Sequence, residues 1–497
     1  MNPWKSGLQA KEYEMAMSGN NWTSYPRGFL LGVKGTVCPD GFIPGPLIDN
    51  FFIHPETHID YVGDSAQFVI VIGTCYSTTQ GKSQDDPEQS VPSLLLNAFS
   101  RSREEFTSEL TQLAGRYIVI VGNKDAISIY PDATAMRAVF YDPRSGVAGS
   151  HLKLVASTVG AEPRTDGLPI PGFYPGHLTP FERIKILTPN FYLALNDMKM
   201  TRFWPLNPMP SATVAEAAKE VLVRSSIVFG KLVDDYPVKL ALTAGLDSRV
   251  STAVGVNSGR KFGSYTYGKT RDTRIDRLVA PALAEKFEIE HKILKTRKVP
   301  EDLKKLLDQA TYWDHHWSAV APLAEWLSGV EPAIITTNIL ELGRRNYDPI
   351  VAKRGLPEPL GAEEMGTLFY HNYAAKRIAA DVREFGIQEY RARLTEIFAE
   401  WIEDTGGPTP DFIDPFEQYF WEFRMSSRHG PMQVERDFYG EATNVFNSHA
   451  ILEQFLAVSQ SEQAEAALFY RLINDVSEGL LEIPINPKEW PPTGDDT

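Results

Sequence analysis

The N-terminal part of the chain alternates short apolar runs with turn residues. Each run is rich in β-branched and aromatic residues and is bounded by turn-forming residues, a pattern that indicates β-strands. Short strands separated by turns predict a layered, largely antiparallel domain up to about residue 205. The predicted strands are Phe29–Val33, Phe68–Cys75, Tyr117–Val121, Ala126–Tyr130 and Met136–Tyr141.

A proline-rich stretch then interrupts this pattern. Pro205, Pro208 and Pro210 each fix φ and lack a backbone donor, so neither a helix nor a central strand continues through them. We therefore divide the chain into two domains, residues 1–208 and 209–497.

The second domain alternates strands with helices. Thr213 and Glu216 have the Thr-x-x-Glu spacing of a capping box, which predicts a helix to about Phe229. The strand–helix alternation that follows predicts a parallel sheet covered on both faces, and the part after about Gly361 is helical in pattern and extends this domain. The predicted strands are Val238–Leu242, Phe262–Tyr267 and Ile289–Leu294, with helices over Ile275–Phe287 and Glu301–Ala310.

Composition and net charge favour a folded globular protein and disfavour a nucleic-acid-binding one. The chain has 497 residues, of which 43% are hydrophobic and 23% charged, as in folded globular proteins. Its formal net charge of -15 disfavours contact with nucleic acid, because phosphate backbones require clustered Lys and Arg. We therefore expect no nucleic-acid partner.

Several features predict a cytoplasmic protein without a membrane span. Cys38 and Cys75 are the two cysteines of the chain, which fits a reducing compartment. The segment Met1–Met17 carries four charged residues and no apolar core, so it does not resemble a signal peptide. The most apolar runs are shorter than the roughly 18 residues that cross a bilayer.

One stretch combines a strand end, small residues and a helix start. Small side chains let backbone N–H groups approach an anion, and the start of a helix adds the positive end of its dipole. The hydroxyls of Thr243 and Ser248 add donors, whereas the Asp247 carboxylate suits Mg²⁺. On spacing alone, an ordinary capped turn explains the stretch equally well. Its residues are Leu242, Thr243, Ala244, Gly245, Leu246, Asp247 and Ser248.

This stretch resembles the pyrophosphatase loop, Ser/Thr-Gly-Gly-x-Asp-Ser, of the asparagine synthetases, β-lactam synthetases and lasso-peptide cyclases. Other landmarks of that family follow in order, and an ordered set over residues 115–345 is far more specific than one loop. In the second domain they are Asp276, Ala280, Ala284 and His291. In the first domain they are Gly115-Arg116-Tyr117, Asp132, Arg137, Tyr141, Ala156-Ser157, Pro189-Asn190 and Phe203-Trp204.

The resemblance implies a fold and a reaction. The fold would be an α/β protein with an N-terminal Ntn-amidotransferase-like αββα layered domain and a C-terminal parallel-sheet ATP pyrophosphatase domain with a helical extension. The cofactors would be ATP and Mg²⁺, and the reaction would pass through an acyl-adenylate with AMP and pyrophosphate as products. Positioning and charge neutralisation would then supply most of the catalysis.

The resemblance also assigns individual residues. The stretch 242–248 would bind the nucleotide phosphates, and Tyr267 and Thr337 would complete the nucleotide site from the ends of the neighbouring strands. Glu341 takes by spacing the place of a second Mg²⁺-binding carboxylate beside Asp247. Lys488 resembles the lysine near the family's C-terminus that stabilises developing charge, although a solvated surface lysine explains it equally well.

Three departures from the family change these expectations. The start Met1-Asn2-Pro3 lacks the cysteine that hydrolyses glutamine in relatives, so we expect a structural N-terminal domain and no glutaminase activity. Ala244 replaces a Gly, which preserves the phosphate cradle only if its φ is negative. Asn338 stands where relatives carry a Glu or Tyr, and an amide is no general base. A helix that merely starts at Thr337 and Asn338 is nearly as good an explanation.

Two further groups have simpler explanations. His315 and His316, next to Asp314, point apart on a helix or a strand, so we expect no metal site there. Two arginine pairs have the chemistry to clamp a carboxylate or phosphate, although surface ion pairs are the commoner role. They are Arg344 with Arg345 and Arg424 with Arg428.

Together these features favour an AMP-forming amide ligase. Its substrates would be a small-molecule or peptide carboxylate and an amine, in specialised-metabolite, lactam or macrolactam biosynthesis. Open alternatives are an ammonia-dependent asparagine-synthetase-like enzyme and a non-catalytic relative that binds a nucleotide or a partner protein. A third is thiolation or another adenylation on tRNA, which the net charge and the N-terminal landmarks disfavour. A homodimer also remains open.

Overall fold

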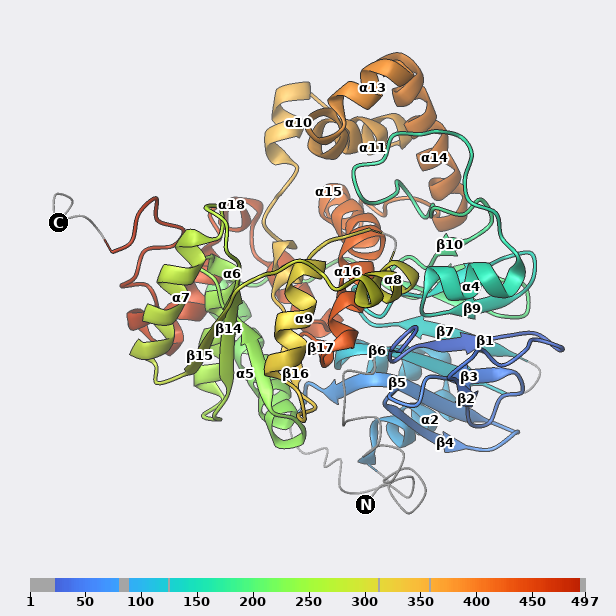
Figure 1. Cartoon of the computed structure of the whole chain (residues 1–497), viewed down its shortest axis with the longest axis horizontal. Helices are drawn as coiled ribbons and strands as arrows, with labels where there is room; N and C mark the ends of the chain where they lie inside the picture. The colour runs from blue at the N-terminus through green and yellow to red at the C-terminus, as the bar shows by residue number, and fades with distance from the viewer. Residues whose placement is uncertain (1–22, 80–88, 124–125, 312, 357–358, 492–497) are drawn as a thin grey trace.

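The computed structural model describes residues 23–79, 89–123, 126–311, 313–356 and 359–491. Its N-terminal part contains two six-stranded antiparallel sheets that pack face to face (Figure 1). The first sheet comprises, in spatial order, β10 (Lys185–Ile186), β8 (Phe140–Asp142), β9 (Val147–Gly149), β1 (Phe29–Leu31), β3 (Phe51–Ile53) and β2 (Ile43–Pro44). The second comprises β12 (Lys199–Arg202), β11 (Phe191–Ala194), β7 (Ile127–Pro131), β6 (Leu113–Gly122), β5 (Phe68–Ser77) and β4 (Ile59–Gly63).

Side-chain alternation along β5 and β6 explains the layering. Ile70 pairs with Ile120, and both belong to the apolar core between the two sheets. Val71 and Val119 point the other way and pack with helices. Because both faces are buried, these strands are continuous apolar runs rather than alternating ones.

Helices cover the outer faces of both sheets. The second sheet packs against α2 (Val91–Arg101) and α3 (Arg103–Thr111), and the first against α4 (Leu152–Val159). This completes four layers in the order helix, sheet, sheet, helix. The predicted αββα domain is therefore confirmed, although the sequence pattern had not revealed its helices.

One predicted strand is shorter than expected. Met136–Tyr141 was predicted as a strand, but β8 begins only at Phe140. The preceding residues form a turn around the buried Asp132, whose carboxylate accepts hydrogen bonds from the backbone N–H groups of Met136 and Arg137. Those N–H groups are consequently not available to a β-ladder.

The C-terminal part is built on a five-stranded parallel sheet. Its strands, in spatial order, are β15 (Glu290–Leu294), β14 (Gly263–Tyr267), β13 (Val238–Ala241), β16 (Ala333–Ile335) and β17 (Glu441–Thr443). The first helices are α5 (Val214–Asp235), α6 (Leu246–Asn257), α7 (Arg274–Lys286), α8 (Glu301–Ala310) and α9 (Trp317–Trp326). The predicted capping box at Thr213 and Glu216 is present, and the helix that it starts continues beyond Phe229 to Asp235.

The two faces of this sheet pack against different helices. Leu240 and Ile335 share a core with residues of α5, α6 and α7, whereas Ile334 lies in a separate core with Leu323 of α9. The predicted parallel sheet with two covered faces is therefore confirmed. The sequence pattern did not reveal β17, which is three residues long and begins with a glutamate.

The remainder is helical, as predicted: α10, α11, α13 and α14 form the group at the top of Figure 1, whereas α17 and α19 pack against helices of the parallel-sheet domain. Two of its segments, η4 and η5, are π-helical. The elements are η3 (Asn338–Glu341), α10 (Asp348–Arg354), α11 (Ala362–Phe369), η4 (Tyr370–Ala374), α12 (Ala375–Arg377), α13 (Ala379–Phe385), α14 (Ile387–Thr405), α15 (Pro415–Tyr419), η5 (Phe420–His429), α16 (Gly430–Gln433), η6 (Val434–Phe438), α17 (His449–Ala457), α18 (Gln460–Ala464), α19 (Ala467–Val476) and η7 (Glu478–Leu480).

Buried ion pairs join the antiparallel sheets to the parallel sheet. Arg116 on β6 binds both carboxylate oxygens of Asp437, at 2.5 and 2.9 Å, and Arg137 binds Glu441 of β17 at 2.7 Å. All four side chains are at most 2% exposed. Asp132 extends the network by accepting a hydrogen bond from Asn447. Three of the landmarks recognised in the sequence, Arg116, Asp132 and Arg137, thus lie where the two parts of the chain meet.

We predict that Asp437→Asn lowers the free energy of unfolding by about 3 kcal/mol or more, because Arg116 is left as a buried charge without its partner. Urea unfolding monitored by tryptophan fluorescence measures the change. The matched control is Glu105→Gln, which breaks the exposed Arg101–Glu105 pair and should cost less than about 0.5 kcal/mol. Equal effects of the two substitutions would contradict this role for the buried pairs.

Candidate functional site

The candidate site lies where two neighbouring parallel strands end. Leu240 of β13 pairs with Ile335 of β16, so the chain leaves both strands at the same edge of the sheet. The loop 242–245 then leads into α6, and residues 336–337 lead into η3, which contacts α6. Clefts at the carboxyl ends of parallel strands are the usual ligand sites of such sheets.

The loop before α6 is compact and held by its own hydroxyls. Ala244 does not adopt a positive φ, so the alanine in place of glycine leaves the turn unstrained. The backbone N–H of Gly245 donates to Thr243 Oγ1 at 3.1 Å, and that of Thr243 donates to Ser248 Oγ at 3.2 Å. Gly245 caps α6 without a side chain, so the first N–H groups of the helix remain free of capping hydrogen bonds.

A carboxylate from the next helix fixes the loop from the side. Asp276, in the first turn of α7, accepts a hydrogen bond of 2.8 Å from the backbone N–H of Ala244. Ala280 and Ala284 lie on the same helix and are buried, which brings α7 close to the core. The Asp-x3-Ala-x3-Ala landmark therefore has a physical basis in this chain, since its aspartate orients the loop.

Asp247 lies in the first turn of α6, and two charged neighbours affect the pKa of its carboxyl. Burial raises the pKa of its carboxyl to about 6; Arg344 opposes that rise, and Glu341 adds to it. Arg344 Nη1 donates to Asp247 Oδ1 at 2.8 Å. The two carboxylates proposed for Mg²⁺ are thus close enough to interact electrostatically, and one of them is balanced by an arginine.

Glu341 faces a second pair of polar residues. Its Oε2 lies 3.8 Å from Nε2 of His429, and the other ring nitrogen of His429, Nδ1, lies 2.9 Å from the amide nitrogen of Asn338. Burial and neighbouring arginines hold the pKa of His429 well below its usual range. A neutral imidazole whose Nδ1 accepts from Asn338 carries its proton on Nε2, which points towards Glu341. Asn338 therefore orients a histidine in addition to starting η3.

The carboxylates suit a divalent cation. Asp247 of α6 and Glu341 of η3 provide hard oxygen ligands, and their mutual repulsion would be relieved by a doubly charged ion. Arg344 supplies a single positive charge at Asp247. The donor set therefore fits Mg²⁺, provided that Arg344 moves away from Asp247 or pairs with a ligand.

Glu417 supports the loop that carries Arg344. It is buried, and it accepts hydrogen bonds from the backbone N–H groups of Gly343 at 2.8 Å and Arg345 at 2.9 Å. Burial raises the pKa of Glu417 to about 7. The side chain of Arg345 pairs with Asp348 and Asp414, so Arg345 has the structural role of an ion-paired arginine.

Arg249 holds the C-terminal segment, residues 480–488, against the loop 242–245 that is the candidate phosphate loop. This fully buried arginine follows Ser248 and donates hydrogen bonds to the carbonyl oxygens of Leu480, Ile483 and Pro484. The backbone N–H of Asn486 also donates to Ala244 O at 3.1 Å. Lys488 lies two residues further on and is exposed. The segment expected to supply a cation is therefore next to the loop, but the part assigned to Lys488 stays a prediction.

The remaining predicted residues lie around the same edge. Leu242 is buried beneath the loop, and Thr337 directly precedes η3. The ring of Tyr267 lies 5.4 Å from that of His316. His315 and His316 were expected to point apart, but their rings stack at 4.2 Å, because the loop before α9 is neither helix nor strand.

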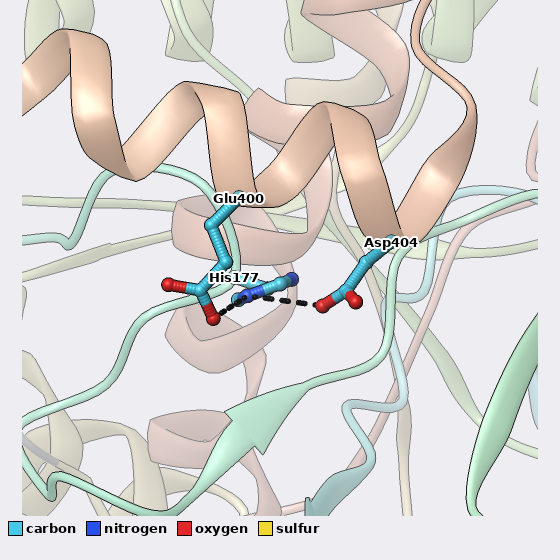
Figure 2. A group of neighbouring side chains, drawn as sticks. All are labelled: His177, Glu400 and Asp404. Carbon is cyan, nitrogen blue, oxygen red and sulfur yellow. Dashed lines mark hydrogen bonds and ion pairs between the residues drawn. The ribbon is translucent and has the colours of Figure 1, made fainter.

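A histidine and two carboxylates also meet on the helical extension, away from these loops (Figure 2). Nε2 of His177 lies 3.5 Å from both Glu400 and Asp404 of α14. Lys185 Nζ lies 2.6 Å from Asp404 and 3.1 Å from Glu400, so the carboxylates already have a cation. This group connects the strand β10 to α14 and has the features of an ion-pair cluster rather than of a metal site.

Neither cysteine of the N-terminal domain has the features of a reactive thiol. Met1, Asn2 and Pro3, and the segment Met1–Met17, lie outside those residues. Cys38 and Cys75 are both only partly buried, and neither forms a disulfide. Burial raises the pKa of each thiol, which makes it less nucleophilic.

Comparisons with known proteins find similarity only at the level of structure. No family model matches the chain, and no curated protein sequence matches it. Glutamine-dependent NAD+ synthetase from Acinetobacter baumannii, solved in complex with ADP, is 13% identical over 44% of this chain and 51% of that chain, with a TM-score of 0.19. Glutamine phosphoribosylpyrophosphate amidotransferase from B. subtilis, complexed with ADP and GMP, is 12% identical over 56% of this chain and 57% of that chain, with a TM-score of 0.19.

A third structure, NMN synthetase from Francisella tularensis, is 13% identical over 44% of this chain and 97% of that chain, with a TM-score of 0.21. The chain spans about half the length of the first two proteins. It is thus an α/β protein with distant structural similarity to two synthetases and an amidotransferase, and these scores carry nothing about its reaction. Among the helices that the structure describes, none is both long and apolar enough to cross a bilayer.

We predict that Arg249→Met releases the C-terminal segment while most of the protein remains folded. The substitution removes the donors that hold the carbonyls of residues 480–484, so their amides should exchange hydrogen faster in a mass-spectrometric exchange experiment. Lys286→Gln is the matched control, because Lys286 pairs with Glu482 of the same segment at an exposed position. Unchanged exchange in Arg249→Met would contradict the anchoring role.

Proposed function

We propose that this chain is an ATP-dependent, amide-bond-forming synthetase. A substrate carboxylate would attack the α-phosphate of ATP, giving an acyl-adenylate and releasing pyrophosphate. An amine would then attack the acyl carbon, giving the amide and releasing AMP. The substrate classes are a small-molecule or peptide carboxylate and an amine, with lactam or macrolactam formation as the preferred case.

The observation that carries the proposal is the meeting of Asp247 and Glu341. They lie almost a hundred positions apart in the sequence, just after the ends of β13 and β16, and the charge of Glu341 contributes to the raised pKa of Asp247. Beside them is the start of α6, whose first-turn N–H groups have no side-chain cap and are available to an anion. Two carboxylates beside the N-terminus of a helix are a common arrangement for binding Mg²⁺ together with the phosphates of a nucleotide.

Several residues of the site would position ATP and the metal ion. The first turn of α6 would bind phosphate oxygens, and Asp276 would keep the loop in shape. Asp247 and Glu341 would hold Mg²⁺, which when bound neutralises the charge on the pyrophosphate that leaves. Arg344, released from Asp247, would have a phosphate or a carboxylate as its new partner.

The nitrogen donor would be an amine other than glutamine. None of the described residues supplies a reactive thiolate to the N-terminal domain, since the pKa values of Cys38 and Cys75 are raised. His429 is neutral and carries its proton on Nε2, so it suits hydrogen-bond donation better than proton abstraction. An amine that arrives unprotonated, or one that is part of the substrate itself, fits such a site best.

One observation favours a second candidate, a nucleotide-binding protein without turnover. Arg344 already occupies Asp247, and the hydroxyls of Thr243 and Ser248 are engaged within the loop. In that case ATP would bind and no AMP would form. The two candidates therefore differ in a single measurable product.

The test is Mg²⁺-dependent release of AMP and pyrophosphate from ATP by the purified full chain, supplied with small-molecule extract of the source organism. We expect release that requires extract and falls below detection in Asp247→Ala. Asp234→Ala is the matched control and should retain activity, because Asp234 pairs with Arg260 at an exposed position on α5.

Binding of ATP without formation of AMP would favour the second candidate, a nucleotide-binding protein without turnover. Equal release by Asp247→Ala and the unmodified protein would show that the chemistry, if present, does not use this site.

A further inference from the structure

A groove of about 720 Å³ lies where three segments of the chain meet, and none of the residues assigned to ATP or Mg²⁺ lines it. Its walls come from the proline-rich stretch 208–213, from residues 410–417 and from residues 456–463. Backbone hydrogen bonds join these segments, since Met209 N–H donates to the carbonyl of Phe412 at 2.7 Å. Ligand sites commonly have volumes of about 300 to 1,000 Å³, so this one can hold a small molecule or a long side chain. We call it the linker groove.

The linker groove is lined by carboxylates and, among the described residues, by no Lys or Arg. Asp414 pairs with Arg345 at 2.9 Å, but Arg345 also serves Asp348. Burial raises the pKa of Glu417 to about 7, so the other carboxylates provide most of the negative charge at neutral pH. A cleft lined by charges of one sign concentrates ligands of the opposite sign. The lining carboxylates are Glu216, Asp411, Asp414, Glu417 and Glu462.

Three of these carboxylates cap the starts of helices. Glu216 and Glu462 complete capping boxes with Thr213 and Ser459, and Asp414 caps α15. Each helix start contributes about half a positive charge, which is less than the full negative charge of the carboxylate that caps it. The helix starts that face the linker groove are thus already occupied, and the groove keeps its negative sign.

Two other lining residues have no such structural role. Asp411 is exposed, and its side chain makes no hydrogen bond or ion pair with any described residue. Gln463 is only 6% exposed, and its Oε1 has no hydrogen-bond partner among the described residues. The orientation of this amide is fixed, because its Nε2 donates to the carbonyl oxygens of Leu456 at 3.2 Å and Val458 at 2.9 Å. A buried acceptor without a donor costs stability until a ligand supplies one.

The remaining wall of the linker groove is largely apolar. Met209, Phe412 and Leu456 line it and are each partly exposed. Such side chains suit the methylene groups of a ligand whose charged end lies among carboxylates, as they do for the stems of Lys and Arg. The groove therefore combines a negative region, a buried acceptor and an apolar surface.

We propose that the linker groove binds an organic cation, a guanidinium or ammonium group joined to a short apolar chain. The carboxylates would balance its charge, and Asp411 and Gln463 Oε1 would accept hydrogen bonds from its N–H groups. A guanidinium has five N–H donors, so it matches several acceptors at once. Such a group is available either as a free molecule or as a basic side chain of a peptide. Binding here requires neither ATP nor turnover, so the inference is independent of the proposed function.

NMR titration that detects the ligand, at constant ionic strength and with the purified full chain, tests this site. The probes are n-butylguanidinium and the blocked peptide acetyl-Ala-Arg-Ala-amide, and n-butylurea is the neutral control of the same shape. Asp411→Lys reverses an exposed charge that has no partner to lose, so the fold should persist. Gln463→Met removes the buried acceptor at similar side-chain length. Glu403→Lys is the matched control, because Glu403 is exposed on α14 and does not line the groove.

We expect at least one cationic probe to bind the unmodified protein and n-butylurea not to bind. Asp411→Lys should weaken binding about tenfold or more and Gln463→Met should weaken it as well, whereas Glu403→Lys should change it less than about twofold. Binding of the peptide alone would identify the ligand as a basic side chain, and binding of both probes would extend it to free cations. The inference is overturned if neither cation binds, if n-butylurea binds equally well, or if the two charge reversals have equal effects.

Discussion

The buried pairs Arg116–Asp437 and Arg137–Glu441 determine how the two halves of the chain meet. Glu441 starts β17, the strand that completes the parallel sheet next to β16. Asp437 lies in η6, a few residues after η5, and η5 supplies His429, which faces Glu341. An N-terminal domain whose cysteines are poor nucleophiles thus has a clear structural part: its arginines fix the segment that forms one wall of the candidate site. Breaking either pair would leave a charge buried, which is why we expect the halves to unfold together.

The site itself shows the opposite electrostatic arrangement. Around the domain contact the buried Arg116 and Arg137 each have a carboxylate opposite. By contrast, Nε and Nη1 of the buried Arg424, which the sequence led us to expect in a surface ion pair, have no hydrogen-bond partner among the described residues. Asp247 and Glu341 likewise repel each other, and Arg344 is bound to Asp247. Two neighbouring carboxylates that share one arginine, and a buried guanidinium with unmatched donors, cost stability, and a bound metal, nucleotide and anionic substrate would remove that cost. This contrast is the physical basis for regarding the edge of the parallel sheet as the functional region.

Local signals predicted most of the fold. The apolar runs of β5 and β6, the Thr213 capping box and the loop at Thr243 are each specified within a few residues, and Asp276 was found by its spacing before its contact with Ala244 was known. Features that depend on distant residues could not be predicted. β17 is too short to show a pattern, and the partner of Asn338 is His429, ninety-one residues later. Arg249 was missed although it directly follows the loop, because only its burial reveals that it holds residues 480–484. The boundary at residue 208 stays a prediction.

The most direct test of the central claim is the binding of α,β-methylene ATP with and without Mg²⁺, which requires no knowledge of the substrate. Glu341→Gln removes one charge from the carboxylate pair, and Glu290→Gln, on the exposed side of β15, is its control. The account predicts Mg²⁺-dependent binding that weakens about tenfold or more in Glu341→Gln and is unchanged in the control. Binding that ignores Mg²⁺, or equal affinity in both variants, would contradict the assignment of Asp247 and Glu341 as the metal-binding centre.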